Sequence, residues 1–147
     1  MSEGVHIVCA HCDAVNRVPP EKNAAGATCG RGQRRLFDGH PENVGDAGLI
    51  KQIERSDIPV VVDFWAEWCG PCRMMATGYA AAASELEPRI RFLKVDVDQH
   101  KQAAAKFGVQ GIPALFVFRK GEIVAQQAGA MNAAALKSWI VNATRAV

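Results

Sequence analysis

The chain has 147 residues, which is enough for one compact domain of ordinary size plus a small appendage, but not for two full domains. Its 17 Lys and Arg residues nearly balance its 15 Asp and Glu residues, and the formal net charge is +2. This balance argues against a protein that binds nucleic acid or a membrane surface through electrostatic attraction.

The N-terminal residues, Met1 to His6, lack the basic start and the long apolar run of a signal peptide. No other stretch approaches the roughly 20 apolar residues that a membrane-spanning helix needs. We therefore expect a cytoplasmic protein with no membrane partner and no nucleic-acid partner, and a monomer is the expected oligomeric state.

Five cysteines in a chain with no export signal indicate metal ligands or redox thiols, because cytosolic reductants keep structural disulfides rare. They fall into two groups, and these predict two separate sites: Cys9, Cys12 and Cys29 in the first, and Cys69 and Cys72 in the second. The first group lies in residues 1–40, which are rich in Gly, Pro and Cys and short of apolar runs. Such a segment cannot build a hydrophobic core alone.

From residue 43 the pattern becomes that of a folded domain. Four apolar residues at helical spacing predict an amphipathic helix that ends before Pro59: Val44, Leu49, Ile50 and Ile53. Residues 59–65 form a continuous β-branched and aromatic run, which predicts a central strand buried on both faces. Pro71 suits the first turn of the next helix, and Pro88 ends that helix.

The rest of the chain continues the alternation of strand and helix. The predicted elements are a strand over 89–97, a helix over 99–107, and strands over 114–118 and 122–127 joined by a hairpin at Lys120-Gly121. Asn132 is the predicted N-cap of a closing helix. This α/β pattern predicts a domain over 43–147, with a mixed sheet of four to five strands flanked by helices, and a small Cys-bearing module over 1–40.

The second cysteine pair lies where the predicted central strand gives way to a helix. A thiolate attacks disulfides and a thiol does not, so a reactive cysteine needs a lowered pKa. Free backbone N–H groups and the helix dipole favour a negative sulfur at Cys69. Cys72 lies one turn later and reaches back to Cys69. A lone Cys-x-x-Cys is often half of a zinc site, but this position between strand and helix favours redox chemistry.

The segment Asp-Phe-Trp-Ala-Glu-Trp-Cys-Gly-Pro-Cys, residues 63–72, resembles the active-site segment of the thioredoxin family. The later segments Lys94-Val95-Asp96 and Gly111-Ile112-Pro113, and then Gly129, follow in the family's order. The resemblance implies a thioredoxin fold and a protein-disulfide reductase that needs no cofactor for its redox step. It also implies that Cys69 is the nucleophile and Cys72 the resolving thiol.

The same resemblance implies roles for further residues. Asp63, at the end of an apolar strand, would have a raised pKa and accept the proton of Cys72, with Lys94 as its charge partner. Ile112-Pro113 resembles the family's cis-proline turn, which would face the disulfide and pair with an extended substrate. The remaining substrate-binding residues would form an apolar contact surface: Trp68, Gly70, Pro71 and Gly129. Disulfide-containing proteins and thioredoxin reductase are the implied partners.

One position departs from the family's pattern. The family usually has a proline five residues after the second cysteine, and this chain has Thr77 there. Without the proline, we expect a straighter helix.

The N-terminal cysteines resemble a zinc ribbon with one ligand missing. Cys9 and Cys12 form a Cys-x-x-Cys pair, Cys29 follows after sixteen residues, and Gly32 stands where a fourth cysteine would complete the site. The arrangement resembles thioredoxins of the thioredoxin 2 type and implies zinc bound by Cys9, Cys12 and Cys29. The fourth ligand stays open between water and a side chain, with His11 or His40 ahead of the other candidates, His6, Asp13 and Asp38. Alternatively, the module is degenerate and binds no metal, and Cys9 and Cys12 form a redox-sensitive pair.

Two functions therefore remain open at this point. The first is reduction of disulfides in cytosolic proteins by the Cys69/Cys72 dithiol, which a thioredoxin reductase restores. The alternative is a zinc-regulated redox-sensing chaperone or interaction protein, in which the N-terminal module selects a partner and the dithiol only reports redox state. Repeated turnover of a disulfide substrate distinguishes the two functions.

Overall fold

The computed structural model describes residues 4–145, so the ends of the two expected ranges, residues 1–3 and 146–147, lie outside the described residues. The main sheet has five strands in the order β3-β5-β4-β6-β7. These strands are β3 (Glu42–Asn43), β4 (Val60–Trp65), β5 (Arg91–Asp96), β6 (Ala114–Arg119) and β7 (Glu122–Ala128). The pairs β3·β5 and β4·β5 are parallel, whereas β6 runs antiparallel to β4 and β7. The prediction of a mixed sheet is confirmed.

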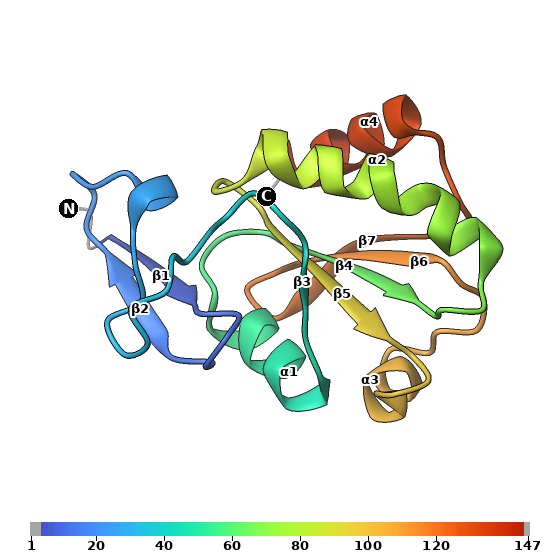
Figure 1. The fold of residues 1–147 in the computed structure, drawn as a ribbon, viewed down its shortest axis with the longest axis horizontal. Coiled ribbons are helices and arrows are strands. Elements are labelled where there is room, and N and C mark those ends of the chain that lie inside the picture. Colours follow the sequence, from blue (N-terminus) through green and yellow to red (C-terminus); the bar gives the residue numbers. More distant parts are fainter. Residues whose placement is uncertain (1–3, 146–147) are drawn as a thin grey trace.

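Helices cover both faces of this sheet (Figure 1). They are α1 (Asp46–Arg55), α2 (Gly70–Leu86), α3 (Lys101–Lys106) and α4 (Ala133–Arg145), and α2 and α4 lie on one face while α1 and α3 lie on the other. The central strand β4 is buried along most of its length, as its apolar run predicts. The hydroxyl of Tyr79 donates a hydrogen bond to the Leu93 carbonyl (2.7 Å) and fixes α2 on the sheet.

Local signals place the later elements as expected. Lys120 and Gly121 both have positive φ, 52° and 86°, which suits the tight turn of the β6–β7 hairpin. The Asn132 side chain accepts a hydrogen bond from the Ala135 N–H (2.8 Å) at the start of α4. α2 runs through Thr77 without interruption.

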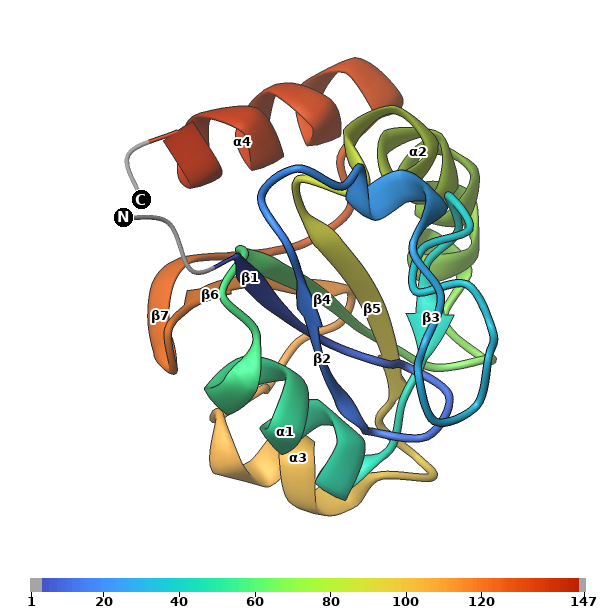
Figure 2. The same ribbon diagram turned by 90° about the vertical axis from the view of Figure 1, so that its left-hand side faces the viewer.

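The N-terminal residues form a small module at one end of the main sheet (Figures 1 and 2). Its strands β1 (Val5–Val8) and β2 (Val15–Val18) pair antiparallel, and a short 3₁₀ helix, η1 (Ala24–Gly26), follows. These strands were not expected from the sequence because each has only four residues. The module packs a small cluster of its own: Ile7, Cys9, Val18, Cys29, Leu36 and Phe37.

A buried arginine joins this module to the main sheet. The Arg91 side chain, at the start of β5, donates hydrogen bonds to the carbonyls of Leu36 and Val8, each 2.8 Å long. Its guanidinium carbon lies 4.2 Å from the centre of the Phe37 ring. The buried Gln52 amide of α1 donates a second hydrogen bond to the Val8 carbonyl (3.0 Å). The module therefore docks through backbone carbonyls that would otherwise be buried without partners.

We expect Arg91→Met to lower the free energy of unfolding by about 3 kcal/mol, because it leaves the Leu36 carbonyl without its charged donor. Urea unfolding measures this loss, and hydrogen exchange should show faster exchange in residues 4–40. Arg89→Met is the matched control, since Arg89 lies two residues away and is exposed. Equal effects of the two variants would contradict the docking role of Arg91.

Among residues 4–145, no helix is both long enough and apolar enough to cross a membrane.

Candidate functional site

The two cysteines of the redox motif lie at the start of α2, just after β4. Cys69 and Cys72 are joined as a disulfide. Cys69 is the N-cap of α2, and its sulfur accepts a hydrogen bond from the Cys72 N–H (3.2 Å). A negative charge on Cys69 would be stabilised by this N–H and by the helix dipole. The local pattern of strand, Cys-x-x-Cys and helix therefore places the pair as expected.

The turn at Ile112-Pro113 lies against this pair. The Ile112–Pro113 peptide bond is cis, and the Ile112 carbonyl oxygen lies 3.8 Å from the Cys69 sulfur. Gly129 donates its N–H to the Pro113 carbonyl (2.8 Å), and its φ of +96° is a conformation that favours glycine. The structure thus brings the late Gly129 beside the cis-proline turn.

Asp63 lies on β4 and is almost completely buried, with 1% of its surface exposed. Burial raises the pKa of Asp63 to about 7, and the positive charge of Lys94 opposes this rise. Among the described residues, its Oδ1 atom has no hydrogen-bond partner. Lys94 is the register partner of Asp63 on β5, but its ammonium group lies over the Trp65 ring, 4.4 Å from the centroid. Lys94 therefore acts on Asp63 through its charge and not through a direct hydrogen bond.

Trp68, which precedes Cys69 in the chain, is an apolar side chain with 70% of its surface exposed. Its indole N–H donates a hydrogen bond to Asp98 (2.8 Å), and the Asp96 carboxylate in turn accepts one from the Asp98 N–H (2.9 Å). Asp98 was not among the residues expected at the site, because it lies thirty positions from Trp68. The sequence carries no local signal for this contact.

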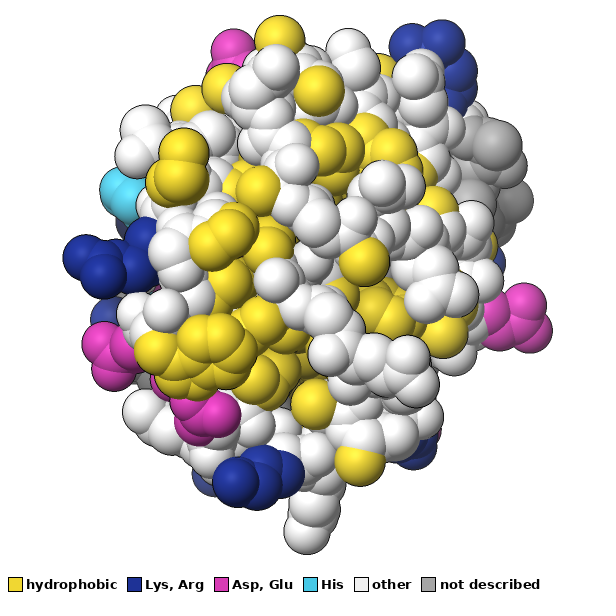
Figure 3. Space-filling view, turned by 90° about the vertical axis from the view of Figure 1, so that its right-hand side faces the viewer, with side chains coloured by type: hydrophobic (Ala, Val, Ile, Leu, Met, Phe, Trp, Pro, Cys, Tyr) yellow, Lys and Arg dark blue, Asp and Glu magenta, His cyan; other side chains and the backbone are white. Residues whose placement is uncertain are grey.

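Figure 3 shows a connected hydrophobic area on the face that contains the N-terminal end of α2. A groove of about 490 Å³ lies between α2 and the start of α4. Two methionines line this groove, Met74, which is 83% exposed, and Met131. Thr77, at the family's proline position, lines it too. Neither methionine was expected at the site: Met74 lies within a helix, where a methionine is equally typical of a core position, and Met131 lies just before α4.

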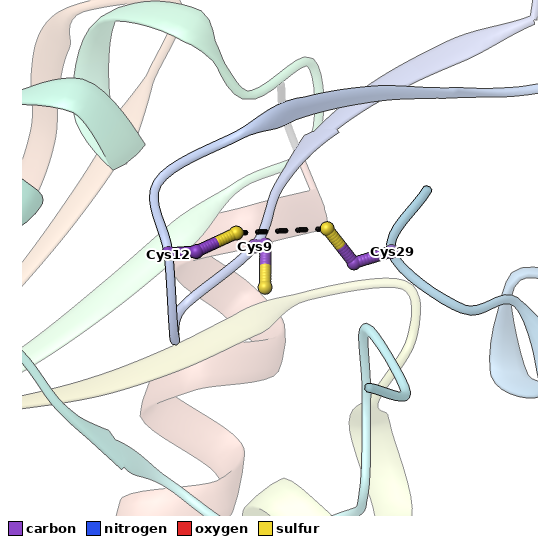
Figure 4. Close-up of side chains that lie close together, drawn as sticks. All are labelled: Cys9, Cys12 and Cys29. Atoms are coloured by element: carbon purple, nitrogen blue, oxygen red, sulfur yellow. Dashed lines mark hydrogen bonds between the residues drawn. The ribbon is translucent and has the colours of Figure 1, made fainter. Parts of the chain in front are cut away.

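The N-terminal cysteines also come together (Figure 4). The sulfurs of Cys9, Cys12 and Cys29 all lie within 4.8 Å of one another, and those of Cys12 and Cys29 are 3.6 Å apart. The N–H groups of Gly32 and Arg31 and the Asn16 amide lower the pKa of Cys29 to about 6. Burial raises the pKa of Cys9.

The other candidate ligands lie elsewhere. His11 pairs with Glu42 (3.7 Å), and the His40 Nδ1 lies 3.0 Å from the Asp38 carbonyl oxygen. Within residues 4–145, no histidine or carboxylate joins the three thiols. Soft thiolates are the ligands that zinc favours in structural sites, so the cluster fits three of the four positions of a zinc site.

Comparisons with known proteins agree with this geometry. The family model for thioredoxin matches residues 42–142, and the model for the N-terminal region of thioredoxin 2 matches residues 8–31. Thioredoxin C-3 of Corynebacterium nephridii is 40% identical over 134 residues, which cover 91% of this chain and 92% of that protein. Thioredoxin 1 of Chlorobaculum tepidum is 45% identical over 91 residues, which cover 62% of this chain and 90% of that protein.

A solved structure of a mutant thioredoxin from Halobacterium salinarum matches with a TM-score of 0.65 and 33% identity, over 74% of this chain and 94% of that one. The thioredoxin of Malassezia sympodialis matches with a TM-score of 0.66 and 29% identity, over the same shares. The fold, the cysteine pair at the start of α2 and these matches show that the chain belongs to the thioredoxin family of protein-disulfide reductases.

Proposed function

We propose that residues 43–147 reduce disulfides in cytosolic proteins, and that a thioredoxin reductase restores the dithiol. The observation that carries this proposal is the Cys69 sulfur at the N-cap of α2, where the Cys72 N–H points at it. In the reduced protein, the Cys69 thiolate attacks one sulfur of the substrate disulfide and displaces the other as a thiolate. A mixed disulfide between Cys69 and the substrate results.

Cys72 then completes the reaction. It gives its proton to Asp63, and its thiolate attacks the Cys69 sulfur and releases the second substrate thiol. Two electrons have passed to the substrate, and the product is the Cys69–Cys72 disulfide, the state of the described structure. A carboxylate whose pKa is about 7 is well matched to accepting a proton near neutral pH. The charge of Lys94 keeps the pKa of Asp63 from rising further.

The substrate surface that we propose surrounds this pair. The cis-proline turn offers the backbone of Ile112 to an extended peptide, and Trp68, Gly70, Pro71 and Gly129 offer a mainly apolar contact area. The groove lined by Met74 and Met131 extends this area, and methionine side chains adapt to partners of different shape.

The test of the proposed function is repeated reduction of insulin disulfides with NADPH and a thioredoxin reductase. Several turnovers per chain are expected. Oxidation of one dithiol per chain with no further turnover would contradict the enzyme function and favour a redox-sensing interaction protein.

We expect Met74→Ser combined with Met131→Ser to raise the KM for insulin about three- to tenfold, because apolar contacts in the groove are lost. The rate with a small aromatic disulfide, too short to reach the groove, should not change. Ile123→Ser is the control, since Ile123 is exposed near the start of β7, at the end of the strand away from Gly129. An equal loss with both substrates would mean that the methionines support the fold and not substrate binding.

A further inference from the structure

The three-cysteine cluster is open on one side, at Gly32. Gly32 is exposed, and a Cβ atom placed on it would lie 4.0 Å from the Cys12 sulfur. Apart from its chain neighbours, such an atom would meet no other group of residues 4–145 within 4 Å. A side chain at position 32 would therefore start within van der Waals distance of the Cys12 sulfur.

Hydrogen bonds within the chain position the backbone at two of the three cysteines, Cys9 and Cys29. The Cys9 N–H donates to the Ala14 carbonyl (2.9 Å), and the Cys29 N–H donates to the Arg34 carbonyl (2.7 Å), so two tight turns each present one buried thiol. The Val8 carbonyl, next to Cys9, is held by Arg91 and Gln52. None of these contacts involves a fourth ligand, so the backbone at Cys9 and Cys29 is positioned without one.

Nothing else in the described part of the chain fills the gap. Asn16 contacts the cluster, but only as a hydrogen-bond donor. Its amide N–H donates to the Cys29 sulfur (3.5 Å), and an amide N–H is no metal ligand. The turn that carries Gly32 is basic: Arg31 precedes it and Arg34 follows two residues later, and both side chains are exposed. The charge around the opening thus favours an anionic ligand.

We propose that the cluster binds a thiophilic divalent ion through Cys9, Cys12 and Cys29, and that the fourth coordination position, open at Gly32, takes the sulfur of an anionic low-molecular-weight thiol. Three thiolates on a divalent ion leave one position for a further ligand. The exchange moves no electrons: the thiol releases its proton to solvent, its sulfur binds to the ion, and a solvent molecule leaves. Cys69 and Cys72 take no part.

The experiment uses the full chain with Cys69→Ser and Cys72→Ser, reduced and loaded with Co²⁺, whose visible absorption reports the number of thiolate ligands. We expect about one Co²⁺ per chain and a spectrum that changes saturably when glutathione is added. Cysteamine, a cationic thiol, should bind about three- to tenfold more weakly. Arg31→Glu together with Arg34→Glu should remove this preference.

Gly32→Cys is the decisive variant. Because Gly32 has no positive φ, a side chain there causes no backbone strain. The variant should show a four-thiolate spectrum from the start and no response to glutathione. Gly32→Ala, which adds a methyl group but no ligand, should still bind Co²⁺.

Three results would overturn the proposal. The first is a chain that binds no Co²⁺, and the second is a spectrum that glutathione leaves unchanged. The third is removal of the metal by glutathione, which would appear as a fall in the cobalt that stays with the protein after desalting.

Discussion

Replacing Cys69 with serine is expected to lower the rate of insulin reduction at least about 1,000-fold, because a serine hydroxyl is not ionised near neutral pH and cannot attack a disulfide. Cys72→Ser should behave differently. It keeps the nucleophile at the N-cap of α2 but has no thiol to resolve the mixed disulfide. We therefore expect it to form a stable covalent complex with its substrate, visible on a non-reducing gel and released by dithiothreitol.

Cys12→Ser is the matched control for both variants, because Cys12 is a partly exposed thiol of the N-terminal module. Its insulin reduction should stay close to that of the unaltered protein. If Cys12→Ser stopped turnover as completely as Cys69→Ser, the N-terminal thiols would belong to the electron path. The assignment of the redox step to Cys69 and Cys72 would then be wrong.

Asp63→Asn is expected to stabilise the oxidised protein at pH 8 while slowing its turnover in the reduced form. Burial raises the pKa of Asp63 from 3.8 to about 7 in the folded protein. The folded state therefore binds this proton more tightly than the unfolded state, and stability falls as the pH rises from about 4 to about 7. Above pH 7 the buried charge costs up to about 4 kcal/mol.

Asparagine removes this charge at nearly constant volume. Urea unfolding at pH 8 should show a gain of about 2–4 kcal/mol for Asp63→Asn, and the gain should disappear near pH 3, below the pKa of Asp63 in both the folded and the unfolded state. Burial also raises the pKa of Glu87 to about 7, but the difference between the two proteins isolates Asp63 because both contain Glu87. Glu54→Gln, which neutralises an exposed carboxylate, should leave the free energy of unfolding unchanged at both pH values.

The kinetic effect of Asp63→Asn concerns the second step of the reaction. Without the carboxylate, Cys72 has no internal proton acceptor, so the mixed disulfide should accumulate during turnover and decay more slowly. Raising the pH should restore much of the rate, since solvent then deprotonates Cys72 directly. The role of Asp63 would be contradicted if Asp63→Asn were as active as the unaltered protein at all pH values. It would also be contradicted if the variant were less stable than the unaltered protein at pH 8.

The prediction from sequence succeeded where neighbours along the chain determine the structure. The apolar run of β4, the Cys-x-x-Cys segment at the start of α2 and the Lys120-Gly121 turn all depend on residues a few positions apart. Helix and strand periodicity and turn chemistry act over such short distances. The redox chemistry was readable for the same reason, because the N-cap position of Cys69 follows from the local order of elements.

Short and irregular elements were not predicted. The four-residue strands β1 and β2 and the two-residue strand β3 are too short to show a period. The main domain contacts them: β3 pairs with β5, and Arg91 of β5 binds carbonyls of the module that lie 55 and 83 residues away. A buried arginine is rare, and its partners here are backbone groups, which carry no sequence signal.

The sequence by itself therefore determined the kind of chemistry, a dithiol at a helix N-terminus in an α/β domain, and the presence of a second group of thiols. Only the tertiary structure decided how that chemistry is surrounded. It left Asp63 without a hydrogen-bond donor at Oδ1 among the residues that the structure describes, placed Lys94 over the Trp65 ring, and opened the three-cysteine cluster at Gly32. The reason is physical: periodicity and capping act between near neighbours, whereas burial, charge and convergence of ligands arise between residues that the folded chain brings together.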